Sequence, residues 1–175
     1  LGDNDLEIAF VEVAGLAKKE QTYLVAHLGW PDKDAPQTAK TALANKDGNF
    51  NSESKLLFEV NREDGRKDFP ARLASRGSGR GSHVKLGLQL FLKTWNPFSD
   101  PLLGTGEWND FSGLLATTEI ATEAIIKQGK DRHATPVATV KFCVRCKRSF
   151  GDSETGGHAV VVDDGVAYVI DAQQE

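Results

Sequence analysis

The chain has 175 residues, which is typical of one domain, and no stretch approaches the roughly 20 apolar residues that a membrane span needs. Hydrophobic residues make up 39% and charged residues 26%, so the composition indicates a globular domain and excludes a large multidomain enzyme. The chain begins at Leu1 and contains no methionine. We therefore expect it to be a piece of a longer protein.

The formal net charge of −4 is distributed unevenly along the chain. After Phe150 there are six acidic residues and no Lys or Arg, so this tail carries −6 and the remaining residues carry +2. We predict a body over residues 1–150 and an acidic extension over residues 151–175. Two cysteines and the lack of an Asn-x-Ser/Thr acceptor favour a reducing, intracellular compartment.

Alternating apolar residues over positions 6–15 predict a half-buried first strand that ends at Gly15. A second apolar run over residues 23–28 predicts the next strand. Residues 29–39 contain two prolines and two aspartates, which favour a loop, and we expect another loop over residues 45–51.

A short apolar run over residues 56–60 predicts a further strand, and the clearest alternation, over residues 84–92, predicts a central one. Between them, residues 62–85 hold seven basic and three acidic side chains. Residues 76–82 within this region are so rich in Gly and Ser that we expect them to be flexible.

Residues 117–128 suit a helix or a strand, and the pattern leaves both open. Residues 140–146 alternate between apolar and basic or thiol side chains, which predicts a strand with one apolar and one basic face. Residues 158–162 and 166–170 flank an Asp-Asp-Gly turn and predict a hairpin. Together these patterns predict an all-β, antiparallel sandwich of about eight strands with a C-terminal hairpin.

The order of short motifs resembles that of the C2-domain family. The motifs are Leu6-x-Ile8-x-Phe10 in the first strand, Thr22-Tyr23-Leu24-Val25 in the second, Lys40-Thr41, Asn49-Phe50-Asn51 and Leu102-Leu103-Gly104. The match spans residues 5–150 and implies an eight-stranded sandwich of the kind that docks proteins onto membranes. An opening strand and a basic-faced closing strand resemble the circularly permuted, type II variant of the family.

The resemblance also implies where a calcium site would lie, on two loops at one tip of the sandwich. Calcium-binding members place about five aspartates there, because this cation takes six to eight oxygen ligands. In this chain the first loop offers Lys18 and Lys19, and the third loop, over residues 93–100, offers only Asp100. We therefore predict no calcium or other metal site and no cofactor.

Cys143 and Cys146 lie three residues apart on a predicted strand, so they should point to opposite faces. This spacing predicts neither a disulfide nor a shared metal, with Cys146 in the core and Cys143 at the surface. No Ser, Cys, His or Asp lies in a nucleophile-elbow or zinc-protease pattern. We predict no catalytic residues and no enzyme activity.

Two groups of residues suggest a membrane role. In the family, a basic cluster on the sheet binds phosphoinositide headgroups, which implies a lipid-binding site at Lys40, Lys141, Arg145 and Lys147. The alternative is an ordinary solvated face. Trp95, Phe98 and Leu102 in the third loop would enter a headgroup layer if exposed, or else pack onto their own sandwich.

We expect a calcium-independent, non-catalytic module that docks a larger protein onto anionic membrane, either cytoplasmic or peripheral to the membrane. The alternative is a protein-protein scaffold that mates with a partner through an open strand edge. The Arg/Gly/Ser stretch over residues 76–82 lacks interleaved aromatics, so no specific nucleic acid is expected. The C-terminal hairpin should dock on its own body or on a second copy, giving a homo-oligomer.

Overall fold

The computed structural model describes residues 1–52, 54–60, 69–74, 84–95, 99–129, 134–151, 158–163 and 166–171. Eight antiparallel strands form one sheet: β1 (Asp5–Ala14), β2 (Thr22–Leu28), β3 (Gln37–Lys40), β4 (Lys55–Glu59), β5 (Leu86–Leu92), β6 (Leu102–Trp108), β7 (Glu119–Gln128) and β8 (Thr135–Cys146). A short helix α1 (Phe69–Ala74) and a 3-10 helix η2 (Phe111–Leu115) accompany them. The predicted all-β, eight-stranded architecture is confirmed.

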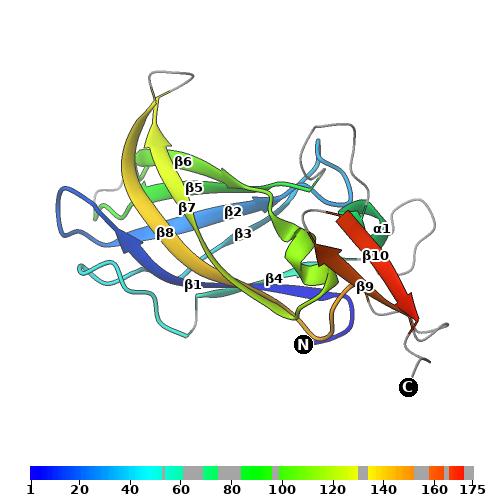
Figure 1. The fold of residues 1–175 in the computed structure, drawn as a ribbon. Coiled ribbons are helices and arrows are strands. Elements are labelled where there is room, and N and C mark those ends of the chain that lie inside the picture. The colour runs from blue at the N-terminus through cyan, green and yellow to red at the C-terminus, as the bar shows by residue number, and fades with distance from the viewer. Residues whose placement is uncertain are drawn as a thin grey trace.

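The sheet folds over on itself into two layers, as Figure 1 shows. Its strand order is β3-β2-β5-β6-β7-β8-β1-β4, so the first four strands form one layer and the last four form the other. The layers join where β6 meets β7, and there the ladder holds a single register pair, Thr105 opposite Lys127. The sheet therefore bends sharply at this junction.

The two outer edges of the sheet, β3 and β4, are joined by one side chain. Gln37 Nε2 donates to the carbonyl of Glu59 at 2.7 Å, and Gln37 Oε1 accepts from the Glu59 amide at 2.9 Å. The amide of Gln37 thus makes the pair of bonds that a neighbouring strand residue would make. This second seam gives the sandwich the character of a nearly closed barrel.

The core lies between the layers and follows the alternation of the strands. In β8 the buried residues are Ala138, Val140, Phe142, Val144 and Cys146, while the residues between them reach the outer face. Phe142 packs against Phe10 of β1 and Trp108 of β6, with ring centroids 5.7 and 5.5 Å apart. The contact with Trp108 joins the two layers and the contact with Phe10 lies within one layer, and both stabilise the sandwich because they remove large aromatic surfaces from water.

Residues 117–128, whose pattern suited a helix or a strand, contain the strand β7. β7 pairs with β8 along its whole length, and Ala124 and Ile126 enter the core. The predicted loop over residues 29–39 is wrong at its end, because β3 begins at Gln37 and pairs with β2. Tertiary pairing decides both segments, since neither has a strong alternation of its own.

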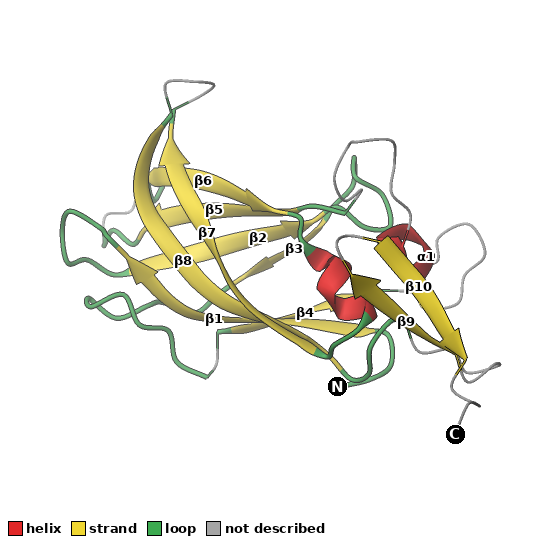
Figure 2. Ribbon diagram, in the orientation of Figure 1, coloured by secondary structure: helices red, strands yellow, loops and turns green. Residues whose placement is uncertain are grey.

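The predicted C-terminal hairpin is confirmed as β9 (His158–Asp163) and β10 (Val166–Asp171), which pair with each other in register. Figure 2 shows this two-stranded sheet apart from the eight-stranded one, with β9 beside η2. The glycine-rich residues 76–82 lie outside the described part of the chain. No helix among the described residues is long and apolar enough to cross a membrane.

Candidate functional site

The predicted lipid-binding residues fall into two separate places. Arg145 lies on the outer face of β8, and Lys141 lies four positions earlier on the same face, while Lys147 follows the strand. Lys40 lies on β3, five strands away in the sheet order and in the other layer. The structure brings the first three together and leaves Lys40 apart from them.

Carboxylates lie close to Lys141 and Arg145 of β8 and to Lys147, which follows that strand. Arg145 donates to Glu119 of β7 at 3.0 Å and to Glu7 of β1 at 3.3 Å. These bonds, the one to Glu119 first, raise the pKa of Arg145 above its ordinary value. Glu12 and Glu123 lie opposite Lys141 on the neighbouring strands, and Lys147 Nζ is 3.7 Å from Asp3. The basic face predicted from the alternation of β8 is therefore balanced by acids from its neighbours.

Lys40 joins the third tip loop instead. Its Nζ lies 4.4 Å from the ring centroid of Tyr23, and the Tyr23 ring stacks on Phe91 of β5 at 5.4 Å. Phe91 is in turn opposite Leu102, the first residue of β6, which is 44% exposed. Lys40 is thus linked across three strands to one end of the loop over residues 93–101.

Asp100 organises that loop. Its Oδ1 accepts from the Thr94 amide at 2.9 Å and from the Thr94 hydroxyl at 3.0 Å, and its Oδ2 accepts from the Tyr23 hydroxyl at 2.7 Å. Lys93 Nζ lies 4.0 Å from the same carboxylate. The Thr94 amide above all, with the Tyr23 hydroxyl next, lowers the pKa of Asp100 from 3.8 to about 2.

Trp95 follows this network and projects from it. The side chain is 82% exposed, and the Lys93 ammonium lies 5.5 Å from its ring centroid. Phe98, predicted to act with it, lies outside the described residues. We call the group formed by Tyr23, Lys40, Phe91, Lys93, Trp95 and Leu102 the Trp95 surface.

A calcium ion would need oxygens beyond those of Asp100, because both of its oxygens already accept hydrogen bonds inside the loop. Among the described residues no group of three or more His, Cys, Asp or Glu side chains lies close enough to hold a metal. Lys19 of the first loop pairs with Asp47 at 3.5 Å, which places another cation at this tip.

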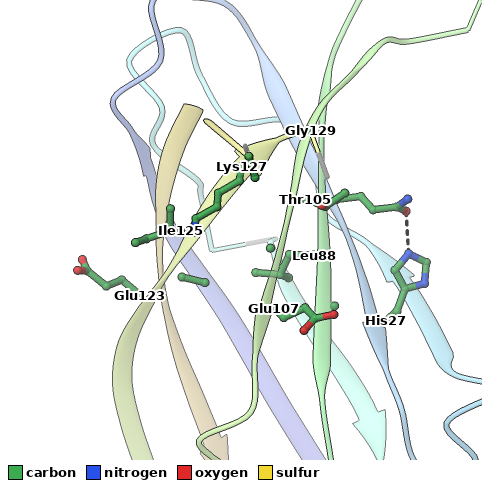
Figure 3. A pocket seen from close by; sticks show the side chains of 13 residues that line it. His27, Leu88, Thr105, Glu107, Glu123, Ile125, Lys127 and Gly129 are labelled. Atoms are coloured by element: carbon green, nitrogen blue, oxygen red, sulfur yellow. Dashed lines mark hydrogen bonds between the residues drawn. The ribbon is translucent and has the colours of Figure 1, made fainter. Parts of the chain in front are cut away.

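A hollow of about 810 Å³ lies over β2, β5, β6 and β7, and Figure 3 shows its lining. Its polar side chains are of mixed charge, with Glu107 and Glu123 alongside Lys127. His27 makes hydrogen bonds to Thr38 at 2.9 Å and to Gln89 at 2.7 Å, which fixes its ring at one side. The mixed charges make this hollow a poor match for an anionic headgroup.

A smaller cavity of about 370 Å³, which we call the slot, opens between the layers at the tip-loop end. Leu92 and Leu103, which bracket the loop that carries Trp95, form one side of it. Leu16 and Val137 form another side, and Lys18 also lines it. Sequence reasoning missed the slot, because its walls come from five segments that only the fold brings together.

The two cysteines behave as their spacing predicts. Cys146 is buried in the core, Cys143 is partly exposed on the outer face, and the two do not form a disulfide with each other. Strand geometry keeps them on opposite faces of β8.

No family model and no curated protein matches this sequence. Solved structures are similar in fold. A structure of CC2D1B, described as coordinating ESRCT-III activity during the mitotic reformation of the nuclear envelope, matches with a TM-score of 0.64 and 17% identity. That match covers 86% of this chain but only 57% of the CC2D1B chain. A C2 domain of a plant Extended Synaptotagmin 1 matches with a TM-score of 0.53 and 13% identity, over 82% of this chain and 94% of that one. The chain therefore has the fold of C2 domains, as the order of its motifs implied.

Proposed function

We propose that the chain is a non-catalytic, calcium-independent C2-like module that docks a larger protein onto anionic, phosphoinositide-containing membrane through the Trp95 surface. The observation that carries this proposal is the 82% exposure of Trp95 at a tip loop that Asp100 holds in place. In this role the protein is intracellular and peripheral to the membrane.

The chemistry of the Trp95 surface suits a lipid interface. Tryptophan is enriched at the headgroup level, because its ring is apolar and its N–H is polar. Lys40 and Lys93 flank the aromatic group, and each basic residue close to an anionic surface contributes about 1 kcal/mol. The exposed Trp95 ring beside the Lys93 ammonium, together with Lys40 over the Tyr23 ring, gives weak docking that depends on salt.

Vesicle sedimentation tests the proposal, with vesicles containing phosphatidylserine and a phosphoinositide at low and moderate salt. The variant Lys40→Gln/Lys93→Gln should weaken binding about thirtyfold, since two contributions of about 1 kcal/mol are lost. Trp95→Ala should also release the protein from the vesicles. Because Trp30 and Trp108 are buried, a blue shift of the fluorescence on binding would report Trp95.

Lys141→Gln/Lys147→Gln is the matched control, because it removes two positive charges from the other layer. It also tests the lipid-binding site predicted on β8, where Lys147 already lies near Asp3. We expect this variant to bind vesicles almost as the wild type does. A large loss in this variant, with none in Lys40→Gln/Lys93→Gln, would assign docking to β8 instead.

Calcium independence has its own test. Melting is measured with about 1 mM calcium and with a chelator, because a ligand of the native state raises the melting temperature by mass action. We expect the two curves to coincide, since hydrogen bonds occupy the Asp100 oxygens. A rise that grows with calcium concentration would contradict the proposal.

A second candidate function is a protein-protein scaffold, and β4 is the observation that favours it. This strand ends the sheet, Gln37 occupies its free edge at Glu59, and its outer face carries Leu57, which is 59% exposed. An edge strand with an exposed apolar residue suits strand addition by a partner. Leu57→Lys should abolish capture of such a partner and leave vesicle binding intact, whereas Trp95→Ala should do the reverse.

A further inference from the structure

The slot has the volume and the lining of a ligand site. Its volume of about 370 Å³ lies within the range of roughly 300 to 1,000 Å³ usual for small-molecule sites. The side chains of Leu16, Leu92, Leu103 and Val137 are only half buried, although they pack beside the core. These four side chains give the slot largely apolar walls.

Thr22 adds a polar group to these walls. The residue is fully buried, it lines the slot, and its hydroxyl has no hydrogen-bond partner within the part of the chain that the structure describes. A buried hydroxyl without a partner is destabilising, because it has lost its bonds to water and gained none. A ligand that bonds to the Thr22 hydroxyl would supply the missing hydrogen bond and account for a polar group in this position.

The slot also adjoins the proposed docking surface. Leu92 directly precedes the loop that carries Trp95, and Leu103 is the second residue of β6 after it. The Lys93 amide donates to the Gln21 carbonyl next to Thr22. The exposed side chain of Lys18 and the half-buried side chain of Glu20 both stand among the lining residues, so the lining carries one positive and one negative charge. A lipid that meets Trp95 therefore lies beside an apolar opening with a cation and a carboxylate next to it.

We infer that the slot takes up one acyl chain of an anionic phospholipid when the module docks. The inference rests on the proposed function, which brings the lipid to this end of the sandwich. The chain occupies the apolar walls, the Thr22 hydroxyl donates to the ester carbonyl, and the Lys18 ammonium lies near the phosphate. The ligand is thus a lipid tail with its ester group, rather than a headgroup alone.

The experiment uses dihexanoylphosphatidylserine, a lipid that dissolves below its micellar concentration, so binding is measured without a membrane. Titration calorimetry should detect binding to the wild type and a rise in melting temperature. Leu103→Trp fills the slot and should abolish both effects. Leu57→Trp adds the same ring to an exposed site on β4 and should leave them unchanged.

Thr22→Val is the sharper variant, because it keeps the shape of the side chain and removes only the hydroxyl. It should lower the affinity for the lipid about fivefold, which is the value of one neutral hydrogen bond. Without lipid, it should raise the melting temperature, since an unpaired buried hydroxyl is gone. An unchanged affinity in a folded Thr22→Val variant would overturn the role of the hydroxyl.

Further measurements separate the failure of this inference from the failure of the proposed function. Trp95→Ala should lose vesicle binding yet keep the affinity for the soluble lipid. If the wild type binds vesicles but not the soluble lipid, the slot inference fails and the docking proposal stands. If it binds the soluble lipid but no vesicles, the docking proposal fails instead. Equal binding of glycerophosphoserine, which has the headgroup without the chains, would overturn the assignment of an acyl chain.

Discussion

Asp100 shows how one carboxylate can shape a loop instead of binding a metal. It accepts hydrogen bonds from Thr94 and from Tyr23, a residue of another strand, and so ties the tip loop to the outer face of β2. Lys40 packs over the same Tyr23 ring. The exposed position of Trp95 therefore depends on a network whose central member is negatively charged.

This network predicts how stability depends on pH. The pKa of Asp100 is lowered from 3.8 to about 2, so its carboxylate stabilises the fold above about pH 4 and this contribution fades as the pH falls toward 2. Asp100→Asn should therefore lower the melting temperature at pH 7, and the difference from the wild type should shrink between pH 4 and pH 2. Thermal melts at a series of pH values measure this.

Asp47→Asn is a matched control for the pH series, because it removes a carboxylate from an exposed ion pair with Lys19. Exposed pairs contribute little, so this variant should melt close to the wild type at every pH. A constant difference between Asp100→Asn and the wild type down to pH 2 would mean that the Asp100 charge does not act in the folded state.

The sequence predicted the position of some site residues but not the side chains that contact them. The motif order placed Lys40 on a strand and Trp95 in a loop, as the structure has them, whereas Leu102, expected in that loop, is the first residue of β6. The partners of Arg145 could not be found in the same way, because Glu7 and Glu119 lie 138 and 26 residues away in sequence. Charge balance across a sheet depends on which strands are neighbours. The alternation along one strand does not show which charges its neighbours carry.

At the scale of elements, β6 is one of the strands that alternation did not predict. Its sequence, LLGTGEW, places glycine at two of the inward positions, so the apolar pattern is interrupted. The structure gives the reason for these glycines. A Cβ at Gly104 would lie 2.7 Å from the Lys127 carbonyl, and one at Gly106 would lie 2.7 Å from the Ile125 carbonyl. The bend between the layers brings β7 this close.

Gly104→Ala should therefore destabilise the protein. The new methyl would meet backbone, which cannot move as a flexible side chain can, so a cost of about 1 to 3 kcal/mol is expected from overpacking. Denaturant unfolding measures it. Gly87→Ala on β5 is the matched control, because its nearest neighbours would be 3.8 Å away and the change should be small. Equal stability of the two variants would show that the junction tolerates a wider separation.

The other strands could be predicted because their patterns agree with their burial. β5 alternates clearly and lies in the interior of the sheet, as expected, and β8 extends its predicted pattern toward Thr135. β3 has only four residues and no apolar alternation. It exists because it pairs with β2 and because Gln37 reaches β4, which are contacts between distant parts of the chain.

At the scale of the whole molecule, the two ends of the sandwich carry different features. The tip loops, the slot and the Trp95 surface share one end, whereas η2, α1 and the hairpin gather at the opposite end (Figure 1). The hairpin therefore lies away from the proposed membrane surface. This arrangement allows the module to meet a lipid layer with one end while the helices and the hairpin stay away from that layer.

The hairpin at that opposite end leads to the last prediction. β9 and β10 pair only with each other among the described residues, and a two-stranded hairpin is marginally stable by itself in water. β9 lies beside η2, whose Phe111 and Leu114 are buried, and the Phe150 amide bonds to the Leu114 carbonyl at 2.7 Å. We predict that the hairpin is held by this contact with its own body, or by a second copy that it joins into a homo-oligomer.

Deleting residues 152–175 tests this prediction by calorimetry and light scattering. If the hairpin docks on its own body, the melting temperature should fall by about 2 to 4 °C for each kcal/mol of lost contact. If it docks on a second copy, the mass in solution should drop to that of a monomer. Hydrogen exchange in the intact chain should show protected amides in β9 and β10. An unchanged melting curve and mass, together with rapid exchange in both strands, would contradict docking, because a hairpin without contacts opens freely.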